Sequence, residues 1–151
     1  MMSIIREGKQ LMDIKVSDLM ISSEKVAHVQ LNNPLEHALL VLVKSGYSAV
    51  PVLDPSYKLV GIIGKTVILD QIIGLERFEF EKLSNHKVQE VVNTDVPTLT
   101  KDASFIEGLK AVINYAFVCV VDEDGYFDGI LTRRSVLKLI KRNFYESKNQ
   151  K

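Results

Sequence analysis

Hydrophobic and polar positions follow the same succession of patterns twice along the chain. Each half begins with a short apolar segment, followed by a stretch with apolar residues at spacings of three and four, which predicts a helix. Two apolar runs joined by a polar turn come next and predict an antiparallel pair of strands. A second helical pattern ends each half. The order of elements predicted for each half is therefore β-α-β-β-α.

The apolar positions within these elements define the expected core. The first strand is predicted at residues 25–29 in one half and 96–99 in the other. The first helix is expected to pack through Leu35, Leu39 and Leu42 in the first half, and through Ile106, Leu109 and Ile113 in the second. The last helices are expected to begin near Thr66 and near Arg133. Their apolar positions are Ile68, Leu69 and Ile72, matched by Val136, Leu137 and Ile140.

The two halves also match each other in sequence, which indicates a duplicated small domain. The spacing from Asp54 to Gly61 equals the spacing from Asp122 to Gly129, so both predicted hairpins have the same length. Because only two copies exist, the chain is a pair of domains and not a repeat array. The domains are predicted at 16–74 and 88–142, with an ordered connector at 75–87 and terminal extensions at 1–15 and 143–151.

A three-stranded sheet of this size cannot have both faces covered by its own two helices. We therefore expect a mixed α/β (α+β) fold in which the two copies pack sheet to sheet with pseudo-two-fold symmetry. The apolar stripes on the helices further predict a homodimer that associates through exposed helix faces.

Composition limits the classes of function. Of the 151 residues, 46% are hydrophobic and 25% are charged, close to the averages of globular domains. Lys+Arg and Asp+Glu both number 19, so the chain has no general attraction for nucleic acid or for an anionic membrane. No signal peptide or membrane-spanning run is visible, and the single cysteine, Cys119, lies in an apolar segment as a buried hydrophobe. We expect a cytoplasmic protein.

Two segments carry a resemblance to a known family. Residues 46–54, Gly-Tyr-Ser-Ala-Val-Pro-Val-Leu-Asp, followed by 59–63, Leu-Val-Gly-Ile-Ile, resemble the CBS domain, and the duplication resembles a tandem CBS pair, or Bateman module. The similarity extends over roughly residues 16–142. Segments 25–30, 35–42 and 74–83 are most similar to the short, stand-alone CBS proteins of the DarB/CbpB type in Gram-positive bacteria.

The resemblance implies a function in signalling. It implies a homodimer that binds the second messenger cyclic di-AMP and regulates partner proteins. The partners it implies are the (p)ppGpp synthetase/hydrolase of the stringent response and pyruvate carboxylase. The expected direction is that a partner binds when the cleft is empty and is released when cyclic di-AMP fills it.

The resemblance also implies where the nucleotide binds. A CBS cleft combines the segment before the first helix, the loop entering the second strand, and the strand-to-helix turn of the other copy. The positions that this assigns to the ligand site are Lys25, Val26, Ala27, Tyr47, Ser48, Ala49, Thr132, Arg133 and Arg134. The second cleft would be formed by Pro97, Thr98, Phe117 and Gly64. Its strand-to-helix turn has Gly64 and Val67 in place of Thr132 and Ser135 and so lacks their polar side chains, and one site per chain is expected.

The chemistry of the residues supports this site. Arg133 and Arg134 fall in the first turn of a predicted helix, where the macrodipole disfavours cations unless an anion is bound there. The alternative is that both arginines extend from a surface turn into solvent. Thr132 is the expected N-cap residue, and Ser135 stands where the family often has an acidic residue that binds ribose hydroxyls. A site with added cations and no such acid suits a ligand with two bridging phosphates.

The remaining positions have two interpretations each. Ala27 leaves room for an adenine edge near the main chain. Lys25 is a further cation at the site or a solvated charge, and Tyr47 is a stacking face for a base or a lid on the core. The alternative function is an AMP-, ADP- or ATP-sensing module or a detached regulatory subunit of an enzyme, and a third is a dimerisation scaffold without ligand.

An enzyme is not expected. The histidines, His28, His37 and His86, lack the spacing of metal ligands, and residues 61–66 lack the glycine spacing of a phosphate-binding loop. We expect neither a metal nor a cofactor.

Overall fold

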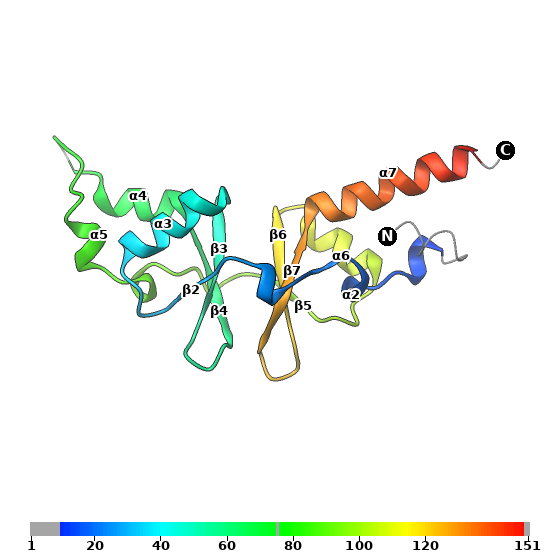
Figure 1. Cartoon of the computed structure of the whole chain (residues 1–151), viewed down its shortest axis with the longest axis horizontal. Coiled ribbons are helices and arrows are strands. Elements are labelled where there is room, and N and C mark those ends of the chain that lie inside the picture. The colour runs from blue at the N-terminus through cyan, green and yellow to red at the C-terminus, as the bar shows by residue number, and fades with distance from the viewer. Residues whose placement is uncertain (1–9, 75, 150–151) are drawn as a thin grey trace. The chain divides into compact units, whose positions relative to one another are not determined.

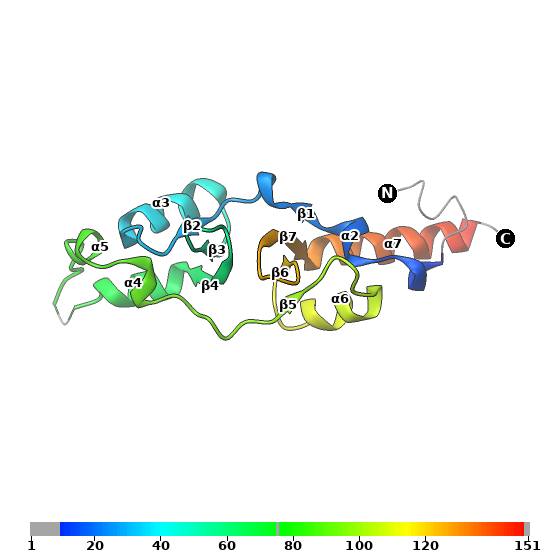
Figure 2. The same cartoon turned by 90° about the horizontal axis from the view of Figure 1, so that it is seen from below.

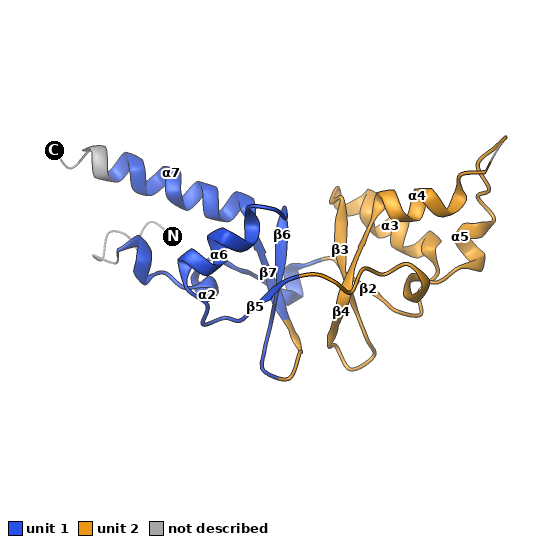
Figure 3. Cartoon of the chain, turned by 180° about the vertical axis from the view of Figure 1, so that it is seen from behind, with its two compact units in different colours: residues 1–26, 97–123, 128–151 blue, residues 27–96, 124–127 orange. Residues whose placement is uncertain are grey.

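The two predicted strand pairs form the centres of two separate sheets, each in its own compact unit. The computed structural model describes residues 10–74 and 76–149 (Figure 1). Of these, unit 1 contains residues 10–26, 97–123 and 128–149, and unit 2 contains the rest, including the hairpin tip 124–127 (Figure 3). The predicted mixed α/β architecture with two small sheets is confirmed.

Unit 2 is built on the aliphatic hairpin of the first repeat. Its sheet has the order β2 (Val29–Gln30), β3 (Ala49–Leu53), β4 (Leu59–Gly64), with β2 parallel and β4 antiparallel to β3. Helices α3 (Leu35–Ser45) and α4 (Lys65–Ile72) cover one face of this sheet (Figures 1 and 2). The core between them is aliphatic and includes Val50, Val52, Ile63, Ile68 and Ile72.

Unit 1 repeats this arrangement with the second hairpin. Its sheet has the order β1 (Ile21–Ser22), β7 (Phe127–Thr132), β6 (Phe117–Val121), β5 (Thr98–Leu99). Helices α6 (Phe105–Val112) and α7 (Arg133–Asn149) cover one face of it. The core contains Val118, Val120, Leu131, Val136 and Leu139.

The two repeats exchange the segments that precede them, which the sequence did not predict. The leading segment of the first repeat, with 3₁₀ helix η1 (Leu11–Asp13) and helix α2 (Val16–Leu19), packs into unit 1, where the Val16 amide donates to the Ala103 carbonyl (2.9 Å). The leading segment of the second repeat contains 3₁₀ helix η3 (Val88–Glu90). It packs into unit 2, where the Val88 amide donates to Asn33 (2.9 Å). The structural units therefore differ from the sequence repeats.

Close backbone contact with these leading segments explains the repeated glycines. A Cβ atom on Gly61 would overlap the backbone carbonyl of Asn93, and one on Gly129 would overlap that of Ile21. Each glycine thus lets a leading segment lie against the hairpin of the unit that receives it.

Three details of the predicted elements were wrong. Of the residues predicted to pack in α6, Ile106 and Leu109 are partly buried against the core, whereas Ile113 is exposed. The fully buried positions, Phe105, Gly108 and Val112, each lie one residue earlier in the chain. Leu69 and Leu137 are also exposed, whereas Leu139 is buried. Residues 25–29 are not one strand, because Ser23–Lys25 forms a 3₁₀ helix, η2, and the strand begins at Val29.

The connector is ordered over its described residues. Ile73 pairs with Phe78 around Gly74, and helix α5 (Lys82–Asn85) follows. Arg77 forms an ion pair with Glu81, and the exposed rings of Phe78 and Phe80 lie 5.8 Å apart. Leu75 lies outside the described residues. None of the helices that the structure describes has the length and apolar character needed to cross a membrane.

Candidate functional site

The turn from β7 into α7 is fixed by Thr132. The Thr132 Oγ1 accepts a hydrogen bond from the Ser135 amide at 3.0 Å and donates to the Ser135 Oγ at 2.8 Å. This is the bond of an N-cap residue to the third helical residue, so the predicted capping role is confirmed. Ser135 offers a neutral hydroxyl at this turn and no carboxylate.

Arg133 is turned toward the neighbouring helix. Its Nε donates to the Val112 carbonyl at 2.8 Å and its Nη2 to the Ile113 carbonyl at 3.3 Å. These carbonyls lie at the C-terminal end of α6, where the helix dipole favours a cation. Arg133 therefore has a structural role that neither sequence interpretation included. A guanidinium has five N–H donors, so others remain for an anion.

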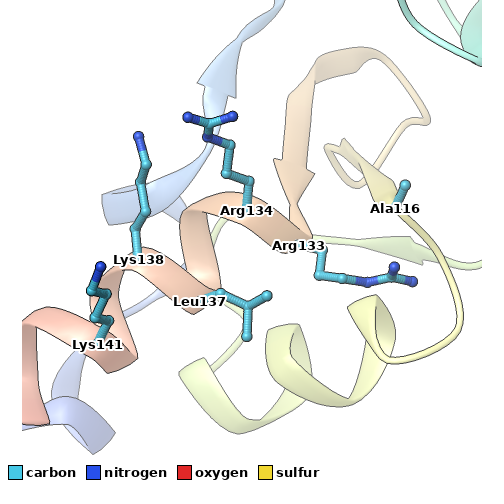
Figure 4. Close-up of a pocket in the computed structure, with 6 residues that line it drawn as sticks. All are labelled: Ala116, Arg133, Arg134, Leu137, Lys138 and Lys141. Atoms are coloured by element: carbon cyan, nitrogen blue, oxygen red, sulfur yellow. The ribbon is translucent and has the colours of Figure 1, made fainter.

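Arg134 is exposed and extends in a different direction from Arg133 (Figure 4). It lines a shallow pocket of about 440 Å³ on one side of α7. Lys138 and Lys141 follow it at spacings of four and three and extend to the same side. The full set of lining residues is Ala116, Arg133, Arg134, Leu137, Lys138 and Lys141. Sequence reasoning missed the two lysines, although their helical spacing from Arg134 was a readable signal.

The predicted residues before the first helix have different environments. Lys25 is the exposed last residue of η2, whose turn is closed by a bond from the Val26 amide to the Ser23 carbonyl (3.1 Å). The Val26 side chain is buried, so this residue can offer a ligand only its backbone. Lys25 and Val26 belong to unit 1, and half-buried Ala27 begins unit 2.

Tyr47, Ser48 and Ala49 lead into β3 in unit 2. Tyr47 follows Gly46, which ends α3 in the left-handed conformation (φ 77°), and its ring is 43% exposed. That exposure favours a ring available for stacking over a lid on the core. The Ser48 carbonyl accepts from the Lys65 amide (3.0 Å), just as the Ala116 carbonyl accepts from Arg133 (2.8 Å).

This pair of equivalent bonds shows how the two turns differ. Both repeats fix the start of their last helix on the loop before the second strand. In the first repeat Gly64 supplies no side-chain cap for α4, and Lys65 stands in place of Arg133. The difference agrees with the expectation that the turn at Gly64 lacks the groups for a nucleotide.

The groups considered for catalysis have other partners. His86 Nδ1 lies 3.0 Å from Glu90 Oε1, and the ring of His28 contacts Tyr57 edge to face at 5.5 Å. Burial raises the pKa of the Cys119 thiol to about 12, which keeps it protonated and unreactive. Within residues 10–74 and 76–149, no three His, Cys, Asp or Glu side chains are grouped so as to hold a metal ion.

Comparison with known proteins gives a consistent result over nearly the whole chain. The model of the CBS domain family matches residues 16–74 and 88–142. The cyclic di-AMP receptor B of Bacillus subtilis is 51% identical over 137 residues, which cover 91% of this chain and 93% of that protein. The CbpB protein of Listeria monocytogenes in complex with c-di-AMP superposes with a TM-score of 0.80 at 51% identity, covering 86% of this chain and 97% of that one. A CBS domain-containing protein of Bacillus anthracis has 61% identity and a TM-score of 0.83, with 87% and 96% covered.

Proposed function

Because the chain belongs to the CBS domain family and carries two copies of the domain, we propose that it is a cyclic di-AMP receptor that regulates partner proteins and has no catalytic activity of its own. The observation that carries the proposal is the similarity to the cyclic di-AMP receptor B of Bacillus subtilis over almost the full length of both proteins. The Listeria protein that was crystallised with c-di-AMP supports the same ligand.

The proposed ligand site combines the residues assigned from the resemblance: Lys25, Val26, Ala27, Tyr47, Ser48, Ala49, Thr132, Arg133 and Arg134. Arg134 is the strongest candidate for a phosphate contact. It is exposed in the first turn of a long helix, where backbone N–H groups and the dipole also favour an anion. It has no ion-pair partner in the part of the chain that the structure describes.

The turn after β7 favours a cyclic dinucleotide over a free adenylate. AMP, ADP and ATP carry two vicinal ribose hydroxyls, for which a carboxylate is a good double acceptor. Ser135 has no carboxylate, and its hydroxyl is already bonded to Thr132. In a 3′,5′-cyclic dinucleotide the 3′ oxygen is esterified, so no vicinal pair remains to be bound. The alternative, an adenylate sensor or detached regulatory subunit, would have to bind these two hydroxyls without a carboxylate at this turn.

The proposed regulation couples ligand and partner. A partner binds the empty homodimer and cyclic di-AMP releases it. By the resemblance, the partners are the (p)ppGpp synthetase/hydrolase and pyruvate carboxylase. Linkage requires that the partner weakens cyclic di-AMP binding by the same factor by which the nucleotide weakens the partner. Titrating each enzyme with and without saturating cyclic di-AMP tests this, and equal dissociation constants would refute the switch.

A thermal-shift panel tests the receptor function itself. At a hundredfold excess over the dissociation constant, a ligand that binds only the folded state adds about 2.7 kcal/mol of stability. For a chain of this length that corresponds to a rise of roughly 5–10 °C in Tm at fixed protein concentration. We expect this rise with cyclic di-AMP and a much smaller one with AMP or ATP. A larger shift with AMP or ATP favours the adenylate sensor, and product formation from any of these nucleotides contradicts the absence of catalysis.

A further inference from the structure

The loop that joins β3 and β4 holds a tyrosine in a conformation that normally belongs to glycine. Tyr57 has a φ of 73°, and among the residues that the structure describes it is the only one other than glycine with a positive φ. This left-handed conformation is strained for a residue with a bulky side chain. Because both hairpins have the same length, the equivalent position of the second repeat is Gly125, which has a φ of 89°. The first repeat therefore has a strained tyrosine where the second has the unstrained residue.

Hydrogen bonds to Asp54 impose this conformation on the turn. The Asp54 carbonyl accepts from the Tyr57 amide at 2.9 Å. The Asp54 carboxylate accepts from the amides of Ser56 (2.8 Å) and Lys58 (3.0 Å). Strained backbone persists only where its surroundings fix it, and such strain is concentrated at functional sites. The strain therefore indicates a function for the side chain that the turn presents.

The Tyr57 ring is held between two other rings of unit 2. It contacts His28 edge to face, with the ring centroids 5.5 Å apart, and its centroid lies 6.4 Å from that of Phe127. Phe127 is buried, and its amide donates to the Tyr57 carbonyl at 3.1 Å. The tyrosine thus rests on a buried ring and supports the half-buried ring of His28. A glycine at this position would provide neither contact.

His28 directly follows Ala27, which the proposed site places against the ligand. Neither residue belongs to a helix or a strand, because η2 ends at Lys25 and β2 begins at Val29. The conformation of this segment therefore depends on the packing of its side chains. A binding segment that is ordered before the ligand arrives loses less entropy on binding. The ring contact of His28 is thus placed where it can affect affinity.

We propose that Tyr57 is a positioning residue of the ligand site. Its ring holds His28, and through His28 the backbone at Ala27, in the conformation that binds the nucleotide. This role explains the strained turn, because glycine would relax the backbone but would provide no ring. The inference rests on the proposed receptor function and deepens it, since it assigns a contribution to a residue outside the set that binds the ligand.

Removal of the ring without disturbance of the turn tests the proposal. Tyr57→Gly accepts the positive φ without strain and has no ring, whereas Tyr57→Phe keeps the ring and is the conservative variant. In calorimetric titration with cyclic di-AMP, Tyr57→Gly should raise the Kd by about three- to tenfold, and Tyr57→Phe should stay within about twofold of the unmodified protein. Phe80→Ala is the matched control, because it removes a ring contact of similar length (5.8 Å, to Phe78) in the same unit. It should leave the Kd unchanged.

His28→Ala shows whether Tyr57 acts through His28. This variant should raise the Kd by a factor similar to that of Tyr57→Gly. In the double variant, the second substitution should add less than about twofold, because both remove the same contact. Thermal unfolding without ligand is measured on every variant, since a role in stability alone would change Tm and leave the Kd unaltered.

Three results would overturn the positioning role while the unmodified protein still binds cyclic di-AMP. They are an unchanged Kd in Tyr57→Gly, fully multiplied effects in the double variant, and an equal loss of affinity in Phe80→Ala. If the unmodified protein itself bound no cyclic di-AMP, the receptor function would fail and the positioning role with it. The titration of the unmodified protein therefore distinguishes the two failures.

Discussion

Arg133 and Arg134 are adjacent in the sequence, yet alanine at the two positions is expected to act on different properties of the protein. Arg133 donates two hydrogen bonds to carbonyls at the end of α6, in addition to its proposed contact with the ligand. Arg134 is exposed in the first turn of α7, and its proposed role is confined to the ligand. The pair thus separates the structural role from the binding role within one helical turn.

The expected magnitudes follow from these contacts. Hydrogen bonds from a charged donor contribute about 1.5–3 kcal/mol when buried. Arg133 is only partly buried, so Arg133→Ala should lower the free energy of unfolding by about 1–2 kcal/mol. This corresponds to a fall in Tm of roughly 2–8 °C. Arg134→Ala should change stability by less than about 0.5 kcal/mol. Each variant should lose about 1.5–3 kcal/mol of cyclic di-AMP binding, a rise in Kd of about 10- to 150-fold.

Calorimetric titration with cyclic di-AMP and thermal unfolding without it measure the two effects separately. Arg77→Ala is the control, because Arg77 pairs with Glu81 in the connector and should leave both Tm and Kd unchanged. Equal melting temperatures for the two variants would refute the structural role of Arg133. Unchanged affinity in Arg134→Ala, together with lost affinity in Arg77→Ala, would show that the site is misplaced.

The remaining predictions concern stability and the reactivity of the single thiol. Gly61→Ala should destabilise unit 2 by about 2 kcal/mol or more, because its Cβ meets the fixed Asn93 carbonyl. Gly46→Ala, which has a positive φ and no clash, should cost only about 1 kcal/mol in denaturant unfolding. The Cys119 thiol should resist aromatic disulfide reagents at pH 8. Burial raises the pKa of this thiol in the folded protein to about 12, so above about pH 9 the thiol loses its proton more readily in the unfolded chain. The free energy of unfolding should therefore fall as the pH rises from about 9 toward 12, and Cys119→Ser should remove that dependence. Thr132→Val should cost about 1 kcal/mol as a lost N-cap.

The duplicated pattern allowed the elements to be predicted well, because an element recognised in one β-α-β-β-α copy is expected at the matching positions of the other. The equal hairpins and the cap at Thr132 depend on residues close together in the chain. Ile106 and Leu109 of α6 pack against the core as predicted, but the centre of the buried face lies one residue earlier, at Gly108. Hydrophobic periodicity does not detect a glycine at a core position, because it has no apolar side chain. Leu69 and Leu137 were assigned to the core although they are exposed. The sequence shows that these helices carry apolar residues on two faces, but it does not show which of the two faces packs against the sheet.

The candidate site was less accessible from sequence where it depends on distant residues. The cap at Thr132 was readable, whereas the carbonyls bound by Arg133 lie 20 and 21 residues away, beyond any local pattern. The 3₁₀ turn at Ser23–Lys25 was missed because apolar Val26, Ala27 and Val29 favour an extended segment. The ligand residues of units 1 and 2 remain assigned through the resemblance, and the variants above test them.

The exchanged leading segments set the order in which the protein can fold during synthesis. Val16 leaves the ribosome early, but its backbone partner, Ala103, is translated 87 residues later. Until then the leading segment and its apolar side chains Ile14 and Leu19 have no groove to occupy. The first hairpin likewise waits for Val88 to complete its core. Neither repeat is therefore an independent folding unit, and a fragment that ends between them should be a substrate for proteases and chaperones, because its apolar segments stay uncovered.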